Sequence, residues 1–146
     1  MERLTNTQIY YVVFDKCHGK EWWDWFLHPR FQHVRMYTAS GGGHNHSGHI
    51  AINPLAHTLS IADNAISVTD MISHEIEQGC TAVLQFTVHY GACYKYAHVE
   101  PLTCVSLAKR VLCIRRRWLL TPKALYHELI KAGAVVIKPY TIVVDR

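Results

Sequence analysis

One cysteine of this chain stands where a helix is predicted to begin. Cys104 follows Thr103, whose hydroxyl suits an N-cap, and opens a run in which apolar residues recur at helical spacing. A thiol in the first turn of a helix lies near unsatisfied backbone N–H groups and the positive end of the helix dipole, which favour the thiolate. Cys104 is therefore a candidate nucleophile. The alternative is a small apolar residue on the buried face of the helix.

A cysteine nucleophile needs a base within hydrogen-bond reach, and a third group usually orients that base. Among the eleven histidines, His33 is the best candidate, because it lies in the alternating run FQHVRMYTA at residues 31–39. A strand in a rigid sheet would fix the direction of its side chain. The alternative is a hydrogen-bonded strand histidine that has no chemical role.

The stretch SGGGHNHSGH, residues 40–49, has the composition of a hairpin turn between two extended runs. If the hairpin folds about Gly43, residues whose numbers sum to 86 lie opposite each other, which places Asn53 across from His33. The amide of Asn53 could then accept the imidazole N–H and hold one tautomer. A neighbouring centre would give another partner, such as Pro54, and would leave His49 or His57 as alternatives.

The same stretch suggests a second kind of site, a zinc ion held by three imidazoles and one further ligand. The candidate ligands are His44, His46 and His49, with Cys17, His18 or Cys93. A triple-glycine turn offers these histidines no rigid element, and HEIEQ at residues 74–78 is not an HExxH motif, because Gln78 replaces the second histidine. Zinc is therefore the weaker alternative, and no cofactor is expected.

The elements that must position these residues are predicted from hydrophobic periodicity and from turn residues. Strands are expected at residues 9–16, 31–39, 48–61 and 82–89, and a short helix at 69–78 with Gly79 as its stop. Residues 22–29 indicate one or two helical turns before Pro29. A helix opens at Cys104, another runs from Thr121 and Pro122 to Gly133, and strands follow at 135–137 and 141–144. This order predicts an α+β fold, an antiparallel sheet with packed helices.

Length and composition indicate one folded domain over residues 1–146, with 49% apolar and 18% charged residues. The N-terminus has too few apolar residues for a signal peptide or a membrane span. Five cysteines without a CxxC pair make reduced thiols the default expectation. The run Arg115–Arg117 is interpreted as a solvated loop or assembly contact, and a nucleic-acid partner is not expected, because no nucleic-acid-binding motif accompanies it.

The order of these residues resembles a known family. A strand-borne histidine followed by a cysteine that opens a helix resembles the circularly permuted branch of the papain-like fold, which includes NlpC-like and lecithin:retinol acyltransferase-like proteins. The run PLTCVSLAKRVLCIRRRWLLTPKALYHELIKAGA, residues 101–134, is also similar to the C-terminal half of small uncharacterised proteins of tailed bacteriophages and proteobacteria. One departure is Cys113, which stands where a glycine is expected between helix and loop.

The resemblance implies acyl transfer at an amide or ester bond, with Cys104 as nucleophile, His33 as base and Asn53 as the orienting amide. His33 would take the thiol proton, and backbone N–H groups at the helix start would receive the oxyanion. A peptidoglycan peptide is the suggested substrate, and the virion or the cytoplasm of a bacterial host is the expected location. The alternative is a non-enzymatic papain-like component of a phage virion, in its tail or head–tail region, that binds other virion proteins.

Overall fold

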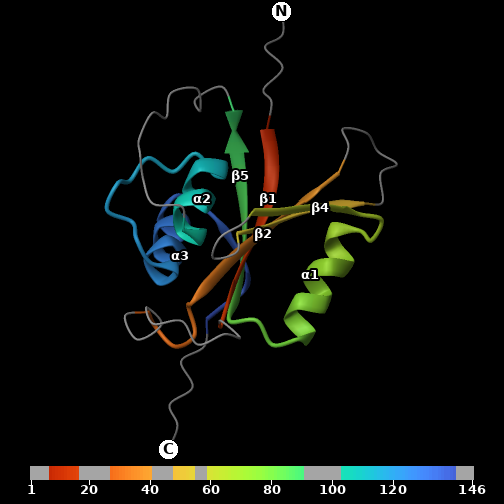
Figure 1. The fold of residues 1–146 in the computed structure, drawn as a ribbon, viewed down its shortest axis with the longest axis horizontal. Helices are drawn as coiled ribbons and strands as arrows, with labels where there is room; N and C mark the ends of the chain where they lie inside the picture. The colour runs from red at the N-terminus through yellow and green to blue at the C-terminus, as the bar shows by residue number, and fades with distance from the viewer. Residues whose placement is uncertain (1–6, 17–26, 41–47, 55–58, 91–102, 141–146) are drawn as a thin grey trace, which may run out of the picture.

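A computed structural model describes residues 7–16, 27–40, 48–54, 59–90 and 103–140 of the chain (Figure 1). Within these residues, six strands form one sheet in the order β4-β3-β2-β1-β5-β6, and every described pair of neighbours is antiparallel. The elements, in chain order, are β1 Thr7–Asp15, β2 His33–Ala39, β3 His49–Pro54, β4 Leu59–Asn64, α1 Val68–Glu77, β5 Ala82–His89, α2 Cys104–Val111, α3 Pro122–Lys131 and β6 Val135–Lys138. The predicted α+β class is confirmed.

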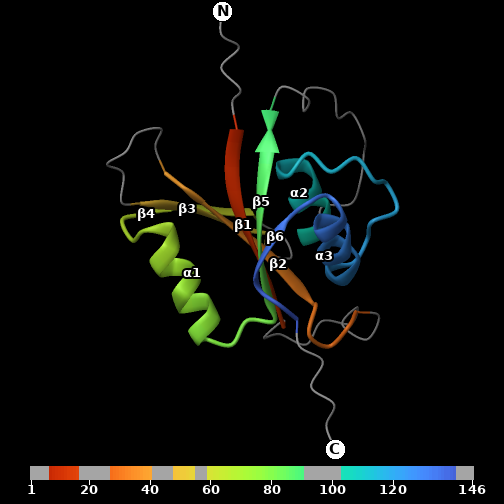
Figure 2. The ribbon, with the colours of Figure 1, turned by 180° about the vertical axis from the view of Figure 1, so that it is seen from behind.

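Helices cover both faces of the sheet, which stands edge-on between them in Figures 1 and 2. α1 lies on one face, and α2 and α3 lie together on the other. Successive residues of the central strand β1 therefore point into different layers, and Val12, Val13 and Phe14 are all fully buried. This explains why the strand has a continuous apolar run rather than an alternating one.

The two faces carry apolar clusters of different size. The larger cluster joins the sheet to α2 and α3 and contains Val12, Phe14, Val34, Met36, Leu84, Val105, Ala108, Leu112, Leu125 and Leu129 among others. The smaller cluster joins the sheet to α1 and consists of Val13, Tyr37, Ile72, Cys80 and Val83 with partly buried neighbours. Residues with odd numbers on β1 and β2 face α1, and residues with even numbers face α2 and α3.

The helices begin and end at the residues that the sequence marks for this purpose. Ser67 caps α1 by accepting the Asp70 N–H at 3.1 Å, and Thr121 caps α3 by accepting the Ala124 N–H at 3.2 Å. Gly79 and Gly133 follow the ends of α1 and α3 with φ of 82° and 94°, a conformation that glycine adopts without steric cost. The helical predictions on the described residues are therefore confirmed to within two residues.

One strand prediction is wrong. The extended run expected over residues 48–61 is two antiparallel strands, β3 and β4, in which Pro54 lies opposite Leu59. Fourteen extended residues would span about 46 Å, far longer than any other strand of this sheet. Pro54 also lacks an N–H for a continuing ladder, so the chain turns back there. The turns expected before Pro29 lie largely outside the described residues, and the strand expected at 141–144 lies wholly outside them.

Cys113 follows α2 with a φ of 58°, in the left-handed region that favours glycine. The backbone therefore agrees with the expectation that a glycine would suit this position. Cys113 is also disulfide-bonded, whereas Cys80 and Cys104 are not. The expectation of reduced thiols is thus wrong for Cys113.

Candidate functional site

His33 and Asn53, two of the three residues proposed from the sequence, are joined by a hydrogen bond. The distance between His33 Nε2 and Asn53 Oδ1 is 2.7 Å. An amide oxygen can only accept, so this contact assigns the proton to Nε2 and leaves Nδ1 as the unprotonated nitrogen of the neutral ring. A histidine held in this way offers Nδ1 as a base.

The contact does not arise from the register that the sequence analysis assumed. Met36 lies opposite Ile52 and Tyr37 opposite Ala51, so facing residues sum to 88 rather than 86. Met36–Ile52 is the last described pair of this ladder, and Asn53 reaches His33 diagonally beyond it. The expected direct pairing of Asn53 with His33 is therefore wrong. The side chains still meet, because a displacement of two residues returns a strand to the same face of the sheet.

A charged network adjoins this pair under α1. Arg35 Nη2 donates to Asp15 Oδ2 at 2.9 Å. The Arg35 guanidinium also forms an ion pair with both carboxylate oxygens of Glu75 in α1. Tyr37 Oη donates to Glu75 Oε1 at 2.6 Å. Asp15 lies directly opposite His33 in the β1–β2 ladder. The network fixes Arg35, which shares the His33 face of β2, and ties α1 to the sheet.

Sequence reasoning did not identify this network. The alternation in β2 places Arg35 and Tyr37 on the face of His33, which was visible in advance. Asp15 and Glu75 come from β1 and α1, and no local spacing connects them to β2. An arginine on the covered face of a strand, however, requires a carboxylate partner, and this requirement is the signal that could have directed a search.

Burial is the main influence on the protonation of His33. Removal from water lowers its pKa below the ordinary value of 6.5, and the nearby Arg35 guanidinium acts in the same direction. The Asn53 hydrogen bond and the Asp15 carboxylate oppose this shift without reversing it. His33 is therefore neutral at pH 7, which is the form a general base requires.

Cys104 occupies the first position of α2, at a helix start held by two reciprocal hydrogen bonds. Thr103 Oγ1 accepts the Ser106 N–H at 3.0 Å, and Ser106 Oγ accepts the Thr103 N–H at 2.8 Å. This capping box fixes the backbone around Cys104. The Cys104 side chain is half-buried and packs against the larger apolar cluster, which includes Val34 and Met36 of β2.

Cys104 therefore lies on the helix that packs over β2 and β3, the two strands that carry His33 and Asn53. Strand alternation directs His33 toward the α1 side of β2, whereas Cys104 packs against the cluster on the other side. The structure thus brings His33 and Asn53 together by a direct contact. A catalytic pair requires the side chains of His33 and Cys104 to meet on one side of the sheet, so their pairing stays a prediction.

His49, the alternative third residue, belongs to a different environment. Its Nδ1–H donates to the Ile66 carbonyl at 2.6 Å, its Nε2 accepts from Asn64 Nδ2 at 3.3 Å, and its ring lies edge-on to Tyr37. It is only 1% exposed. Both ring nitrogens are thus engaged within the protein, and Asn53 is the residue that contacts His33.

The zinc alternative has no support among the described residues. Both nitrogens of His49 have protein partners, and His44 and His46 lie outside the described ranges. Over the part of the chain that the structure describes, no group of three or more His, Cys, Asp or Glu side chains could hold a metal ion. Of the candidate zinc ligands, His49 is therefore engaged elsewhere, and Cys17, His18 and Cys93, like His44 and His46, lie outside the described residues.

Fold and site together define an α+β protein with a His–Asn pair on a sheet and a capped cysteine at a helix start. No family model, curated protein or solved structure matches this chain. No helix among the described residues is long and apolar enough to cross a membrane. Functional conclusions therefore rest on the residues of this chain.

Proposed function

We propose that this chain is a cysteine hydrolase or acyltransferase that acts on an amide or ester bond. The observation that supports the proposal is the 2.7 Å contact between His33 Nε2 and Asn53 Oδ1, because it assigns the tautomer that a thiol-activating base needs. Cys104 is the nucleophile, His33 the base and Asn53 the residue that orients it. This order of residues, His before Cys, is that of a circularly permuted papain-like enzyme.

The proposed reaction requires the His33 ring and the Cys104 thiol to come together, and it begins with transfer of the thiol proton to His33 Nδ1. The thiolate attacks the carbonyl carbon of the substrate, and backbone N–H groups at the start of α2 stabilise the oxyanion. His33 then returns its proton to the leaving amine or alcohol as the carbon–heteroatom bond breaks, which leaves a thioester on Cys104. Water or another acyl acceptor, deprotonated by His33, cleaves the thioester and restores the thiol.

The substrate class follows from the resemblance to NlpC-like proteins. A peptide bond of peptidoglycan is the proposed substrate, and a tailed bacteriophage is the proposed source of the chain. Such an enzyme would act from the virion or in the cytoplasm of a bacterial host.

The proposal is tested by the rate at which iodoacetamide alkylates Cys104 at neutral pH. In the wild type, Cys104 is expected to react at least tenfold faster than an ordinary thiol, because a neighbouring base increases the thiolate fraction. The variant His33→Ala should lose this advantage. Asn53→Ala should lose part of it, because the imidazole is no longer held in one tautomer. Mass spectrometry of tryptic peptides reports the rate for each cysteine.

The chain offers two internal controls for this measurement. Burial raises the pKa of the Cys80 thiol, so Cys80 should react slowly in all variants. His89→Ala removes an exposed histidine at the end of β5 and should leave the Cys104 rate unchanged. A Cys104 that reacts at the rate of an unactivated thiol, or equally fast in His33→Ala, would rule out the enzymatic proposal.

That result would favour a second candidate, a non-enzymatic component of a phage virion. The observation behind it is the apolar surface on both edge strands of the described sheet. Leu59 and Ile61 of β4 are exposed, as are Val135, Val136 and Ile137 of β6. Exposed apolar edges are typical of strands that pair with another chain, as virion proteins would require.

A further inference from the structure

The loop between α2 and α3, residues 112–121, carries apolar side chains into solvent. Trp118 is 90% exposed and Leu120 is 68% exposed, whereas Leu119 between them is only 8% exposed and belongs to the larger apolar cluster. In Figures 1 and 2 this loop forms the outermost edge of the α2–α3 layer. Trp118 and Leu120 are therefore exposed on either side of a buried anchor in this loop.

The loop is held in place by a buried cation and an ion pair. Lys109 is 3% exposed, and its Nζ donates to the carbonyls of Arg116 and Arg117 at 3.1 and 3.4 Å. Arg116 Nε also contacts Glu128 Oε1 of α3 at 3.1 Å. Burying an ammonium group is costly unless its hydrogen bonds are made, so these contacts fix the loop backbone. The fold thus holds the backbone of this loop in a conformation that exposes Trp118. The loop backbone therefore does not have to become ordered when a partner binds.

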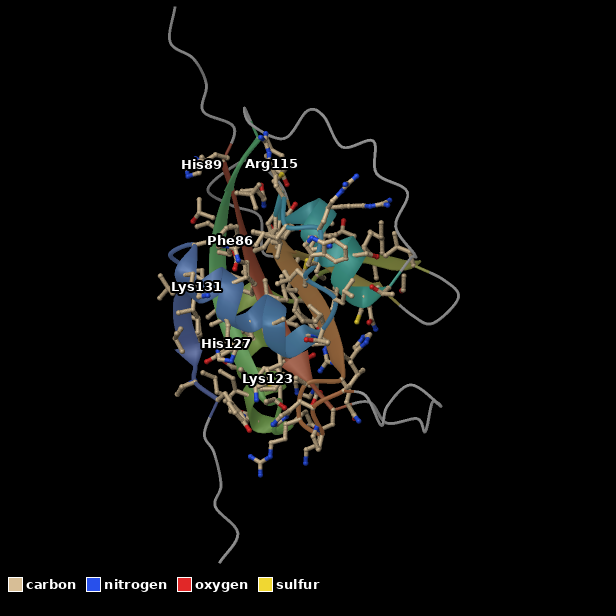
Figure 3. The ribbon with its side chains drawn as sticks, turned by 90° about the vertical axis from the view of Figure 1, so that its left-hand side faces the viewer. Phe86, His89, Arg115, Lys123, His127 and Lys131 are labelled. Atoms are coloured by element: carbon tan, nitrogen blue, oxygen red, sulfur yellow. The ribbon has the colours of Figure 1, made fainter. Side chains whose placement is uncertain are left out.

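The surroundings of the loop are strongly cationic. Residues 104–131 contain seven of the fifteen Lys and Arg residues but only one of the eleven Asp and Glu residues. The rest of the chain therefore has eight cations and ten carboxylates, so the net charge of +4 arises entirely from this segment. In Figure 3, which faces the α2–α3 layer, Lys123, His127 and Lys131 follow one another along α3, and Arg115 lies at the opposite end of the layer from Lys123. The α2–α3 layer and its connecting loop thus carry the excess positive charge of the chain.

We propose that this layer, centred on Trp118 and Leu120, docks on an anionic lipid bilayer. Tryptophan and leucine tips enter the boundary between head groups and acyl chains, and the surrounding Arg and Lys side chains contact anionic head groups. The positive charge complements the bilayer surface, and an outermost loop can reach that surface without a matching groove. The proposal is independent of the chemistry at Cys104.

A single-stranded nucleic acid is the main competing partner for a basic surface with an aromatic residue. Its binding proteins use a groove that follows the backbone and several aromatic rings on which bases stack. This loop has one exposed aromatic ring, on a protruding edge, beside a leucine that cannot stack. The apolar pair therefore favours a bilayer.

The test is cosedimentation of the full chain with vesicles of phosphatidylcholine, with and without phosphatidylglycerol. The wild type should bind only the vesicles that contain phosphatidylglycerol, and added salt should weaken binding. Arg115→Gln with Arg117→Gln should weaken binding about fivefold for each residue. Trp118→Ala with Leu120→Ser should weaken it at least about tenfold, because the inserted apolar area is lost. Ile61→Ser, which removes an exposed apolar residue from β4, is the matched control and should bind as the wild type does.

Insertion is distinguished from electrostatic attraction by lipids with brominated acyl chains. They should quench tryptophan fluorescence in the wild type but much less in Trp118→Phe, which removes the proposed inserting indole. Absence of binding to anionic vesicles at low salt would overturn the proposal, as would wild-type binding by Trp118→Ala with Leu120→Ser. Binding to a labelled single-stranded oligonucleotide without binding to vesicles would assign the surface to nucleic acid instead. Circular dichroism verifies that each variant is folded.

Discussion

At the scale of single residues, the central feature is a histidine whose tautomer and charge are set by its neighbours. Asn53 fixes the proton on Nε2 of His33, and burial keeps the ring neutral at pH 7. Arg35 disfavours a second positive charge nearby, and is itself held by Asp15 and Glu75. Each of these effects is local, so it can be changed by one substitution without altering the sheet.

A titration of His33 checks this account. Its pKa should lie below 6.5 in the wild type, and Asn53→Asp should raise it, because a carboxylate at hydrogen-bond distance favours the imidazolium ion. The lowered value also has a consequence for stability. The unfolded chain takes up this proton more readily than the folded chain, so protonation of His33 favours unfolding. The free energy of unfolding is therefore unaffected by His33 well above pH 6.5 and decreases as the pH falls below that value.

The measurement is an NMR titration of the His33 ring protons. Asn64→Asp places the same new carboxylate beside His49 and should leave the His33 titration almost unchanged. A His33 pKa at or above 6.5 in the wild type would contradict the role of burial. An unchanged pKa in Asn53→Asp would show that the hydrogen bond does not form.

At the scale of elements, the start of α2 is built to hold Cys104 in one geometry. The capping box uses both side chains that flank the first turn, and the helix packs over β2 and β3. α3 begins in a similar way, with Thr121 as its cap and Pro122 in its first turn. The two helices therefore provide a matched pair, one with the proposed nucleophile and one without it.

Removing either cap should reduce stability by a similar amount and affect Cys104 differently. Thr103→Ala and Thr121→Ala should each lower the free energy of unfolding by about 1 kcal/mol, measured by urea denaturation. Only Thr103→Ala should change the alkylation rate of Cys104, because it loosens the backbone on which the thiol stands. If Thr121→Ala changes that rate as much, the rate reports overall stability rather than the geometry of the α2 start.

At the scale of the whole molecule, the sheet is joined to its two helical layers in different ways. α2 and α3 are joined to it by the larger apolar cluster, whereas α1 has the smaller cluster and the buried carboxylate of Glu75. A helix with few apolar contacts detaches at a lower free energy than one that packs over a large core. The attachment of α1 therefore depends on the Arg35–Glu75 ion pair.

Hydrogen exchange should reveal this difference between the layers. Amides of α1 are expected to exchange through a lower-energy opening than those of α3, and Glu75→Gln should lower the α1 opening energy by about 2 kcal/mol, because Arg35 loses a buried partner. Glu77→Gln changes an exposed carboxylate in the same helix and should have almost no effect. Equal protection of α1 and α3 would mean that the sheet and both layers open as one unit.

The sequence by itself determined most of the helices and strands. It also determined that His33 and Asn53 lie on the same face of the sheet. Caps and stop signals are local, so Ser67, Thr103, Thr121, Gly79 and Gly133 mark the helices whatever lies around them. Side chains on a strand alternate between the two faces of the sheet with a period of two. The assumed register differs from the observed one by two residues, so Asn53 still lies on the face of His33 and contacts it. An error of one would have turned Asn53 to the other face.

Only the tertiary structure decided what lies on each side of the sheet. Periodicity shows that His33 and Val34 point in opposite directions, but not which of them faces α2, because that depends on how distant segments pack. The network of Asp15, Arg35 and Glu75 and the fold of residues 48–61 into two strands are likewise products of long-range pairing. Chemistry between His33 and Cys104 therefore depends on which side of the sheet each side chain occupies, and only the assembled sheet defines this.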